Sequence, residues 1–494
     1  MAQLPVCSTA QAADTNATSL AVCKECEPTV LTPWLNMQPN EIGSFSPEIG
    51  VTARNPISAD RNNRKGTITS LAASPSFTQD TMMDGIRYYG NAFLYTVWKG
   101  QPVAGKLPTA TTATGYTVPT GPIVAAGTLV FAAGWANAAN NGLKAVTSGS
   151  TATEIKVAGL VAETATAAAV LHIVGVRAAA DDVAVDADGN LTATALDFTT
   201  LGLTVGQHVQ VGGTASVNRF ANAADYGIAR VEAIAAGKLT LGNTNMQFVA
   251  DTGTGKQIDL YFGSFARNVG VNDADFLRTR FTMEARYNTS PVLYEYARDC
   301  YSNTLALSMP REDKSTMELG FVGKDIEAPV TTRKLGASWT DMAQTTAFNT
   351  TSDIARITIT DPVNDPYGFD LYLSDTTINI DNGATPENSL GNLGATFVNI
   401  NNFTVSLDSE VFMTDGSVLN AIRTNSTVGM TTALRNDDGG FIIDMPAMTL
   451  GDGAKNLSVG EKIKITTSGA VFKDDRLGYS LSISLFGYLP PDAI

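Results

Sequence analysis

Residues 54–84 read RNPISADRNNRKGTITSLAASPSFTQDTMMD, and this stretch is the best starting point for predicting the fold. A turn-rich segment comes first, and a β-type run then opens at 67–69. A second run follows Ser74-Pro75 and passes through Phe77. Turn residues on either side of β-branched runs are typical of a hairpin. The stretch therefore predicts a hairpin-like unit.

The turn of this unit concentrates basic residues in a chain whose formal net charge is −15. A basic turn in an acidic protein favours a docking surface, and a solvated loop with scattered arginines explains the same residues equally simply. We take the docking surface as the working hypothesis. Its candidate contact residues are Arg54, Asn55, Pro56, Arg61, Arg64 and Lys65, with Trp34 from the preceding segment.

Composition limits the classes of protein that this chain can be. Its 494 residues suggest about three domains, and a hydrophobic content of 44% is enough to build their cores. Charged residues make up only 16%, which suits polar β surfaces lying against other protein. The acidic excess argues against a protein that grips nucleic acid, because Lys and Arg drive binding to phosphates. It does not argue against a surface past which DNA slides.

The chain has neither a recognisable signal peptide nor a membrane-spanning helix. The start, MAQLPVCSTAQAADTN, lacks a cationic region and a continuous apolar core. The most apolar window, 157–176, contains Glu163 and His172 and is too polar to span a bilayer. We expect a soluble protein that is made in a cytoplasm and does not insert into membranes.

The four cysteines do not form a recognisable site. Cys23 and Cys26 make a CxxC pair, near which Cys7 is the one further zinc ligand available. A redox pair would need a βαβ context, which the sequence around it does not predict. We therefore expect plain reduced thiols in this N-terminal segment; the fourth cysteine is Cys300.

An internal repeat suggests how the chain is divided. Residues 136–146 read ANAANNGLKAV and residues 221–231 read ANAADYGIARV, an offset of 85 residues. Strand-like runs flank both copies, so each copy predicts a small all-β module. The expected division is an N-terminal arm at 1–50, a β body at 51–103 and 259–494, and two inserted β modules at 104–180 and 181–258.

Within the body, alternating residues predict strands separated by turns. Residues 276–286 predict a long strand, and 304–309 with 315–322 predict a hairpin. Residues 291–301, PVLYEYARDCY, put apolar residues on one helical face after a proline and predict a helix. The aromatic-rich run within 51–100 suits either a short helix or a buried strand. Further strands are expected at 355–360, 376–380, 402–407, 441–444, 461–465 and 479–486.

No stretch predicts an active site. The two histidines, His172 and His208, lie in alternating runs and are expected on strand faces. The segment 251–257, DTGTGKQ, lacks the first glycine and the Ser/Thr of a phosphate loop. Residues 186–190 lack the sixth-position glycine and the final glutamate of a calcium loop, so they predict an Asp-Gly turn. We expect no catalytic residues, no metal, no cofactor and no enzymatic activity.

The outer parts of the chain resemble the tail tube (major tail) proteins of long-tailed, non-contractile bacteriophages. The resemblance rests on 55–67, on 278–309 and on the C-terminal run that includes FIIDMP at 441–446 and GYSLSISLFGYLP at 478–490. It covers roughly 50–100 and 262–490, and the two inserted modules depart from the family pattern.

The resemblance implies a β-sandwich or barrel subunit with one flanking helix. Six such subunits would form a ring, and stacked rings would form the tail tube through which DNA reaches the host. The implied partners are copies of the same chain, the tail terminator, the tape measure and the distal tail protein. DNA would pass through the lumen without specific binding, and the protein would be assembled in the host cytoplasm into the virion tail.

Long strands with polar faces fit this expectation, because their edges can pair with a neighbouring subunit while one face lines a wet channel. An acidic lumen would keep phosphates from sticking. The alternative is another virion or surface β-protein, such as a decoration protein, fibre or adhesin, whose modules bind a cell surface or carbohydrate. A glycosidase is the third possibility, supported only by the abundance of carboxylates.

Overall fold

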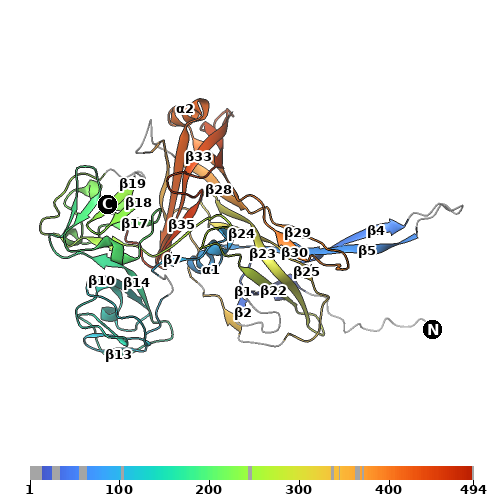
Figure 1. Cartoon of the computed structure of the whole chain (residues 1–494), viewed down its shortest axis with the longest axis horizontal. Coiled ribbons are helices and arrows are strands. Elements are labelled where there is room, and N and C mark those ends of the chain that lie inside the picture. Colours follow the sequence, from blue (N-terminus) through green and yellow to red (C-terminus); the bar gives the residue numbers. More distant parts are fainter. Residues whose placement is uncertain are drawn as a thin grey trace.

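The computed structural model describes residues 14–24, 34–54, 64–101, 105–242, 248–334, 339–343, 345–361, 368–369 and 372–491. These residues form a mainly β protein, as the sequence predicts. A body with a projecting two-stranded hairpin lies on one side, and the inserted modules lie on the other (Figure 1).

The helices are few and short. They are α1 (Met83–Phe93) and α2 (Ser417–Thr424), with 3-10 helices η1 (Thr15–Ala17), η2 (Ala138–Asn140), η3 (Phe198–Leu201), η4 (Ser216–Asn218) and η5 (Ala223–Asp225).

The strands of the body come from both sides of the insert. They are β1 (Ser19–Lys24), β2 (Trp34–Asn36), β3 (Glu41–Ser44), β4 (Pro47–Arg54), β5 (Arg64–Ala73), β6 (Ser76–Asp80), β7 (Lys99–Gly100), β21 (Ser264–Arg267), β22 (Arg280–Tyr287), β23 (Leu293–Met309), β24 (Thr316–Val322), β25 (Asp325–Ile326), β26 (Trp339–Asp341), β27 (Ile354–Thr360), β28 (Leu373–Asp381), β29 (Thr385–Glu387), β30 (Phe397–Asn399), β31 (Thr404–Phe412), β32 (Thr427–Asn436), β33 (Gly439–Asn456), β34 (Lys464–Val471) and β35 (Ser482–Phe486).

The strands of the insert are shorter. They are β8 (Ala110–Thr111), β9 (Gly115–Thr117), β10 (Thr128–Ala133), β11 (Gly142–Ala145), β12 (Glu154–Lys156), β13 (Glu163–Thr164), β14 (Val170–Arg177), β15 (Val183–Val185), β16 (Leu191–Ala193), β17 (His208–Val211), β18 (Gly227–Ala235), β19 (Lys238–Gly242) and β20 (Asp259–Tyr261).

An 18-stranded sheet makes up the body. Part of it is an antiparallel run in the order β3-β6-β24-β23-β28-β31-β34-β33. The long strands β23 and β33 change partners along their length, so that their first halves pair with β22 and β32. Strand β33 also pairs with β35, which continues through β21 to β7.

Helix α1 fills the centre of the body's core. Its residues Ile86, Tyr89 and Phe93 are spaced so that they share one face of the helix, and all three are buried. The ring of Tyr89 lies 6.0 Å from that of Phe77, and the ring of Phe93 lies 5.4 Å from that of Phe321. The helix therefore joins strands from distant parts of the chain into one apolar core.

The prediction of a helix at 291–301 is wrong, because the residues from 293 onward belong to the long strand β23. There Tyr296 is fully buried, packs on the ring of Trp34 at 6.2 Å and donates a hydrogen bond to Glu284 at 2.8 Å. Aromatic residues favour strands, and the pairing with β22 outweighs the helical spacing of a few apolar side chains. The described residues form two α-helices rather than the single flanking helix, and α1 occupies the aromatic-rich run. The hairpin predicted at 304–309 and 315–322 is confirmed.

Much of the segment expected as an N-terminal arm takes part in the sheets. Strand β1 pairs with β22, β2 pairs with β26, and β3 pairs with β6. Cys23 lies in β1 and is disulfide-bonded, so the expectation of a reduced thiol is wrong for this residue. Cys300 is a free, buried thiol, while Cys7 and Cys26 lie outside the described residues.

The two predicted modules of the insert share a sheet. A nine-stranded sheet in the order β11-β10-β14-β20-β17-β18-β19-β16-β15 contains strands from both of them, and a four-stranded sheet, β12-β9-β8-β13, comes from the first alone. The two ends of the insert lie side by side, because β7 pairs with β21. The insert therefore leaves and re-enters the body at one place.

The internal repeat has the same local structure in both copies. Asn137 and Asn222 each cap a 3-10 helix by accepting a backbone N–H, at 3.0 Å in both copies. The third helical residue, Asn140 or Asp225, is fully buried. Asn140 accepts the N–H of Val161 and donates to its carbonyl, both at 2.9 Å. In the second copy a carboxyl replaces this amide.

The carboxyl of Asp225 is less well satisfied than the amide of Asn140. One oxygen accepts the N–H of Val249 at 2.6 Å, and the other has no partner in the described structure. Burial, together with the charge of nearby Asp251 and against the hydrogen bond from Val249, raises the pKa of Asp225 to about 6. The folded chain therefore holds a proton here that the unfolded chain releases near its ordinary pKa of 3.8.

Asp225→Asn is expected to raise the free energy of unfolding at pH 7 by on the order of 1–3 kcal/mol. The wild-type protein loses stability as the pH rises from about 4 to about 6, because the buried carboxyl of Asp225 then loses its proton. The amide of the variant does not titrate and removes this pH dependence. Urea titrations at pH 4, 5, 6 and 7 measure both effects. The matched control is Asn140→Asp in the first copy, which should destabilise at pH 7. An unchanged pH profile for Asp225→Asn would contradict the assignment.

Candidate assembly surfaces

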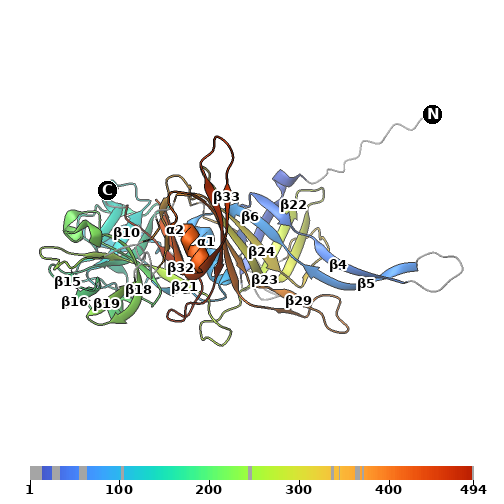
Figure 2. The ribbon, with the colours of Figure 1, turned by 90° about the horizontal axis from the view of Figure 1, so that it is seen from above.

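The two β-type runs expected within 54–84 lie in β5 and β6, but the expected pairing of these runs is wrong, because β5 pairs with β4 while β6 pairs with β3 and β24. The hairpin of β4 and β5 extends far from the body, as both views show (Figures 1 and 2). Arg54 at the end of β4 lies opposite Arg64 at the start of β5, and Lys65 follows. All three are exposed. Asn55, Pro56 and Arg61 lie outside the described residues. The structure thus brings the three described basic residues together near the far end of the ribbon.

One face of this ribbon is apolar and uncovered. Val51 lies opposite Ile68, and Ile49 lies opposite Leu71, so these side chains share a face. Ile49, Val51 and Ile68 are 50%, 61% and 46% exposed. An isolated two-stranded ribbon is marginally stable in water, and exposed apolar patches mark contact sites. The ribbon is therefore a candidate for docking on another protein chain.

The base of the ribbon is fixed to the body. The N–H of Leu71 donates to the carbonyl of Leu393 at 2.7 Å, and the N–H of Gly323 donates to Ala73 at 2.7 Å. Leu393 lies in the loop between β29 and β30, which form a second hairpin. The direction of the projecting ribbon is therefore set by the body.

Trp34 has a different environment from the basic residues. Its side chain is 1% exposed, and its ring stacks on that of Trp339 at 6.2 Å. It anchors the N-terminal segment on the body of its own chain. Its side chain is therefore not part of the surface that the ribbon offers.

The body also exposes one long polar face of its sheet. Along β31, Val405 and Leu407 are buried while Thr404, Ser406 and Asp408 are exposed. The register continues this alternation across neighbouring strands. One cross-strand row reads Glu41, Thr78, Glu318, Ala306, Asn379, Ser406, Ala470 and Thr449. We name this surface the polar sheet face.

The polar sheet face is acidic. Its neighbouring rows add Asp80, Asp375, Asp381, Asp408 and Glu410. Lys314 pairs with Asp80 at 2.8 Å, and Lys464 pairs with Glu410 at 2.6 Å. Because carboxylates exceed lysines here and small residues fill the spaces, this surface does not favour the binding of phosphates.

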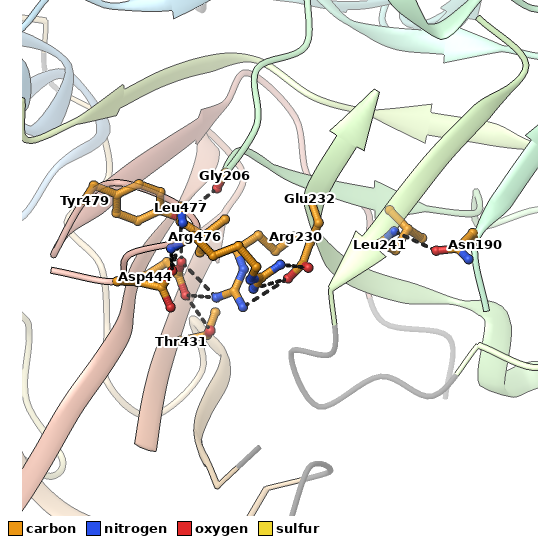
Figure 3. Close-up of polar contacts among 11 residues, drawn as sticks. Asn190, Gly206, Arg230, Glu232, Leu241, Thr431, Asp444, Arg476, Leu477 and Tyr479 are labelled. Carbon is orange, nitrogen blue, oxygen red and sulfur yellow. Dashed lines mark hydrogen bonds and ion pairs between the residues drawn. The ribbon is translucent and has the colours of Figure 1, made fainter. Parts of the chain in front are cut away.

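A buried polar cluster joins the insert to the body (Figure 3). Arg230 on β18 has Nη1 at 3.2 Å from both carboxylate oxygens of Asp444 on β33. Asp444 also accepts hydrogen bonds from Tyr479 at 2.9 Å and from Thr431 at 3.2 Å. Arg230 is 8% and Asp444 1% exposed. A charge buried to this extent needs its partner, so the cluster fixes the insert on the body.

Apolar contacts surround this cluster. Phe131 of the insert stacks on Tyr488 at 4.6 Å, and Ile228 packs among buried residues of β33 and β35. His208 is fully buried on β17, and its backbone N–H donates a hydrogen bond to the hydroxyl of Ser484 at 3.0 Å. Burial lowers the pKa of His208 to about 4, although Asp444 acts in the opposite direction. The imidazole is therefore neutral at pH 7. Together with the ion cluster, these contacts form the seam between insert and body.

The described residues contain no group of three or more His, Cys, Asp or Glu placed to hold a metal ion. Asp186 accepts the N–H groups of Asp188 and Asn190, which confirms the predicted Asp-Gly turn. His172 and His208 lie on strands, as predicted. In the part of the chain that the structure covers, no helix has the length and apolar character needed to cross a membrane.

The seam was not among the features expected from the sequence. A signal was present, because Asp444 interrupts the apolar run FIIDM at 441–445 and Arg230 interrupts GIARV at 227–231. A charge within a buried strand requires a partner, but its identity depends on which strands meet.

Comparison with known proteins supports the resemblance seen in the sequence. The family model described as phage tail tube protein matches residues 234–471, which run from β18 through β34. A search of curated proteins finds no match. The matched part of this chain is therefore similar to the phage tail tube protein family, and this similarity supports a tail tube protein.

Proposed function

We propose that the chain assembles with copies of itself into rings, and that stacked rings form the tail tube through which DNA passes on ejection. The family match supports a structural role for the chain in the virion tail. The observation that carries the proposal is the polar sheet face, which is acidic over many adjacent strands. DNA can slide along such a surface without being held, because phosphates are repelled rather than neutralised.

The uncovered ribbon of β4 and β5 supports stacking. Its apolar face and basic end would dock on a neighbouring copy, with Arg54, Arg64 and Lys65 at the contact and Asn55, Pro56 and Arg61 in the turn between them. A contact in which different surfaces of two copies meet can close into a ring or extend as a filament. The tail terminator, the tape measure and the distal tail protein would meet the ends or the lumen of the tube, and assembly would take place in the host cytoplasm.

We propose a corresponding division of labour along the chain. Residues 51–103 and 259–494 build the tube, together with strands from 1–50. The modules at 104–180 and 181–258 are carried outside it as decorations. Support comes from the single place at which the insert leaves and re-enters the body, between β7 and β21.

Electron microscopy of the purified chain tests the proposal. We expect hollow rings or tubes, and a reconstruction in which Glu318, Asp408 and Ser468 face the channel. Monodisperse monomers under all assembly conditions would contradict tube formation. Tubes whose channel is lined by another surface would contradict the role of the polar sheet face.

A further inference from the structure

The body contains the same arrangement of elements twice. When the short strands β2, β7, β21 and β26 and the insert are set aside, both halves consist of two strands, a hairpin, a strand, an α-helix and then four strands. In the first half these are β1, β3, the β4–β5 hairpin, β6, α1, β22, β23, β24 and β25. In the second half they are β27, β28, the β29–β30 hairpin, β31, α2, β32, β33, β34 and β35. We call them the first unit and the second unit.

The strands of the two units also pair in the same way. In the first unit β1 pairs with β22, β22 with β23, β23 with β24, β24 with β6 and β6 with β3. In the second unit β27 pairs with β32, β32 with β33, β33 with β34, β34 with β31 and β31 with β28. All of these pairs are antiparallel. The insert follows α1 in the first unit, whereas α2 leads almost directly into β32.

Irregularities of the sheet recur at matching positions. The register of β22 with β23 shifts between Phe281 and Met283, and that of β32 with β33 shifts between Val428 and Met430. The long strands β23 and β33 have 17 and 18 residues. Bulges are specific features of a strand pair. Their recurrence shows that the two units are copies of one structural pattern.

The join between the units contains a strand pair of its own. The second half of β23, at the end of the first unit's sheet, pairs with β28, the first strand of the second unit's sheet, so that Ser308 lies opposite Thr377. At the two outer ends of this run of strands, the part of β33 after Thr449 corresponds to the second half of β23, and β3 corresponds to β28. In the described part of the chain, β34 alone pairs with this part of β33 and β6 alone pairs with β3. Unpaired edges of this kind accept a strand from another chain.

We propose that β33 of one copy pairs with β3 of the next copy, as β23 pairs with β28 within the chain. Equivalent positions follow from the registers, since Phe281 faces Cys300 and Val428 faces Met448. Counted from the matched residues Cys300 and Met448, Ser308 in the first unit and Asn456 in the second unit hold equivalent positions. The registers of the neighbouring strands make Ser44 equivalent to Thr377 in the same way. Because Ser308 lies opposite Thr377, Asn456 of one copy would lie opposite Ser44 of the next copy. The partner is a second copy of this chain, joined edge to edge, and the polar sheet face continues across the contact.

The repeat also sets the number of chains in a ring. This step rests on the proposed tube, for which the family resemblance implies six units around the ring. At two units per chain, six units require three chains. Each ring would then alternate an internal join, β23 with β28, and an intermolecular join, β33 with β3.

Cysteine cross-linking tests the contact. The variant Ser44→Cys with Asn456→Cys should form interchain disulfides on mild oxidation, and the largest closed covalent species should contain three chains. The matched pair Ser308→Cys with Thr377→Cys occupies the equivalent internal positions and should cross-link without increasing the mass. Each single variant serves as a control for the natural cysteines.

The outcomes separate this inference from the proposed function. Tubes without cross-links would overturn the edge contact and leave the tube intact. A closed ring of six chains would overturn the role of the repeat in setting the ring. If no rings or tubes form, the proposed function fails. In that case, interchain cross-links in solution would still support the edge contact, and their absence would overturn it.

Discussion

Replacing Asp444 by Ala is expected to lower the free energy of unfolding by about 3–5 kcal/mol, because it leaves the buried guanidinium of Arg230 without its carboxylate. The same change removes the acceptor of the Tyr479 and Thr431 hydroxyls. Urea denaturation measures the loss. The effect should also appear as weaker attachment of the insert, seen as earlier proteolysis of residues near β18.

The matched control is Glu232→Ala, which removes the partner of the exposed Arg476, whose Nη2 donates to Glu232 Oε1 at 2.7 Å. Glu232 also lies 3.5 Å from Arg230, so this control removes the weaker of the two carboxylate contacts of that guanidinium. Exposed ion pairs contribute at most about 1 kcal/mol. A double variant, Asp444→Leu with Arg230→Met, should recover much of the loss, because it removes both buried charges. A loss for Asp444→Ala no larger than that of Glu232→Ala would contradict the structural role of the seam.

The second large effect concerns assembly rather than folding. Val51→Thr with Ile68→Thr should raise the concentration needed for tube formation at least about tenfold. Threonine keeps the β-branched shape that suits a strand, but it removes apolar surface that docking would bury, and 1.4 kcal/mol corresponds to a factor of ten. Light scattering against protein concentration gives the threshold, and urea denaturation should show little change in the monomer.

Val217→Thr and Val249→Thr are the controls for this effect. Both residues lie in the insert and are exposed to a similar degree, at 49% and 43%. They should leave the threshold unchanged. Charge reversal of Arg54, Arg64 and Lys65 to Glu then separates the contribution of the basic end from that of the apolar face. Normal assembly by both ribbon variants would remove the docking role of β4 and β5.

The local features of the fold could be predicted from the sequence. The β-type runs within 54–84, most of the later strands and the repeat in the insert depend on alternation and turn residues, which act between near neighbours. The expected pairing of the two runs within 54–84 failed, because β6 pairs with β3 and β24 instead of β5. The helix at 291–301 failed because a strand partner outweighed the helical spacing. Trp34 could be recognised as an anchor, but the surface that it anchors to was decided by Tyr296 and Trp339.

By itself, the sequence determined a mainly β chain with an acidic surface, a basic turn, a repeated motif in its insert and a resemblance to tail tube proteins. Only the tertiary structure decided that β1 pairs with β22, that Arg230 meets Asp444 and that the body repeats one unit twice. The reason is physical. Alternation determines which side of a strand is buried, but the choice of partner depends on the burial of residues that are hundreds of positions apart in the chain.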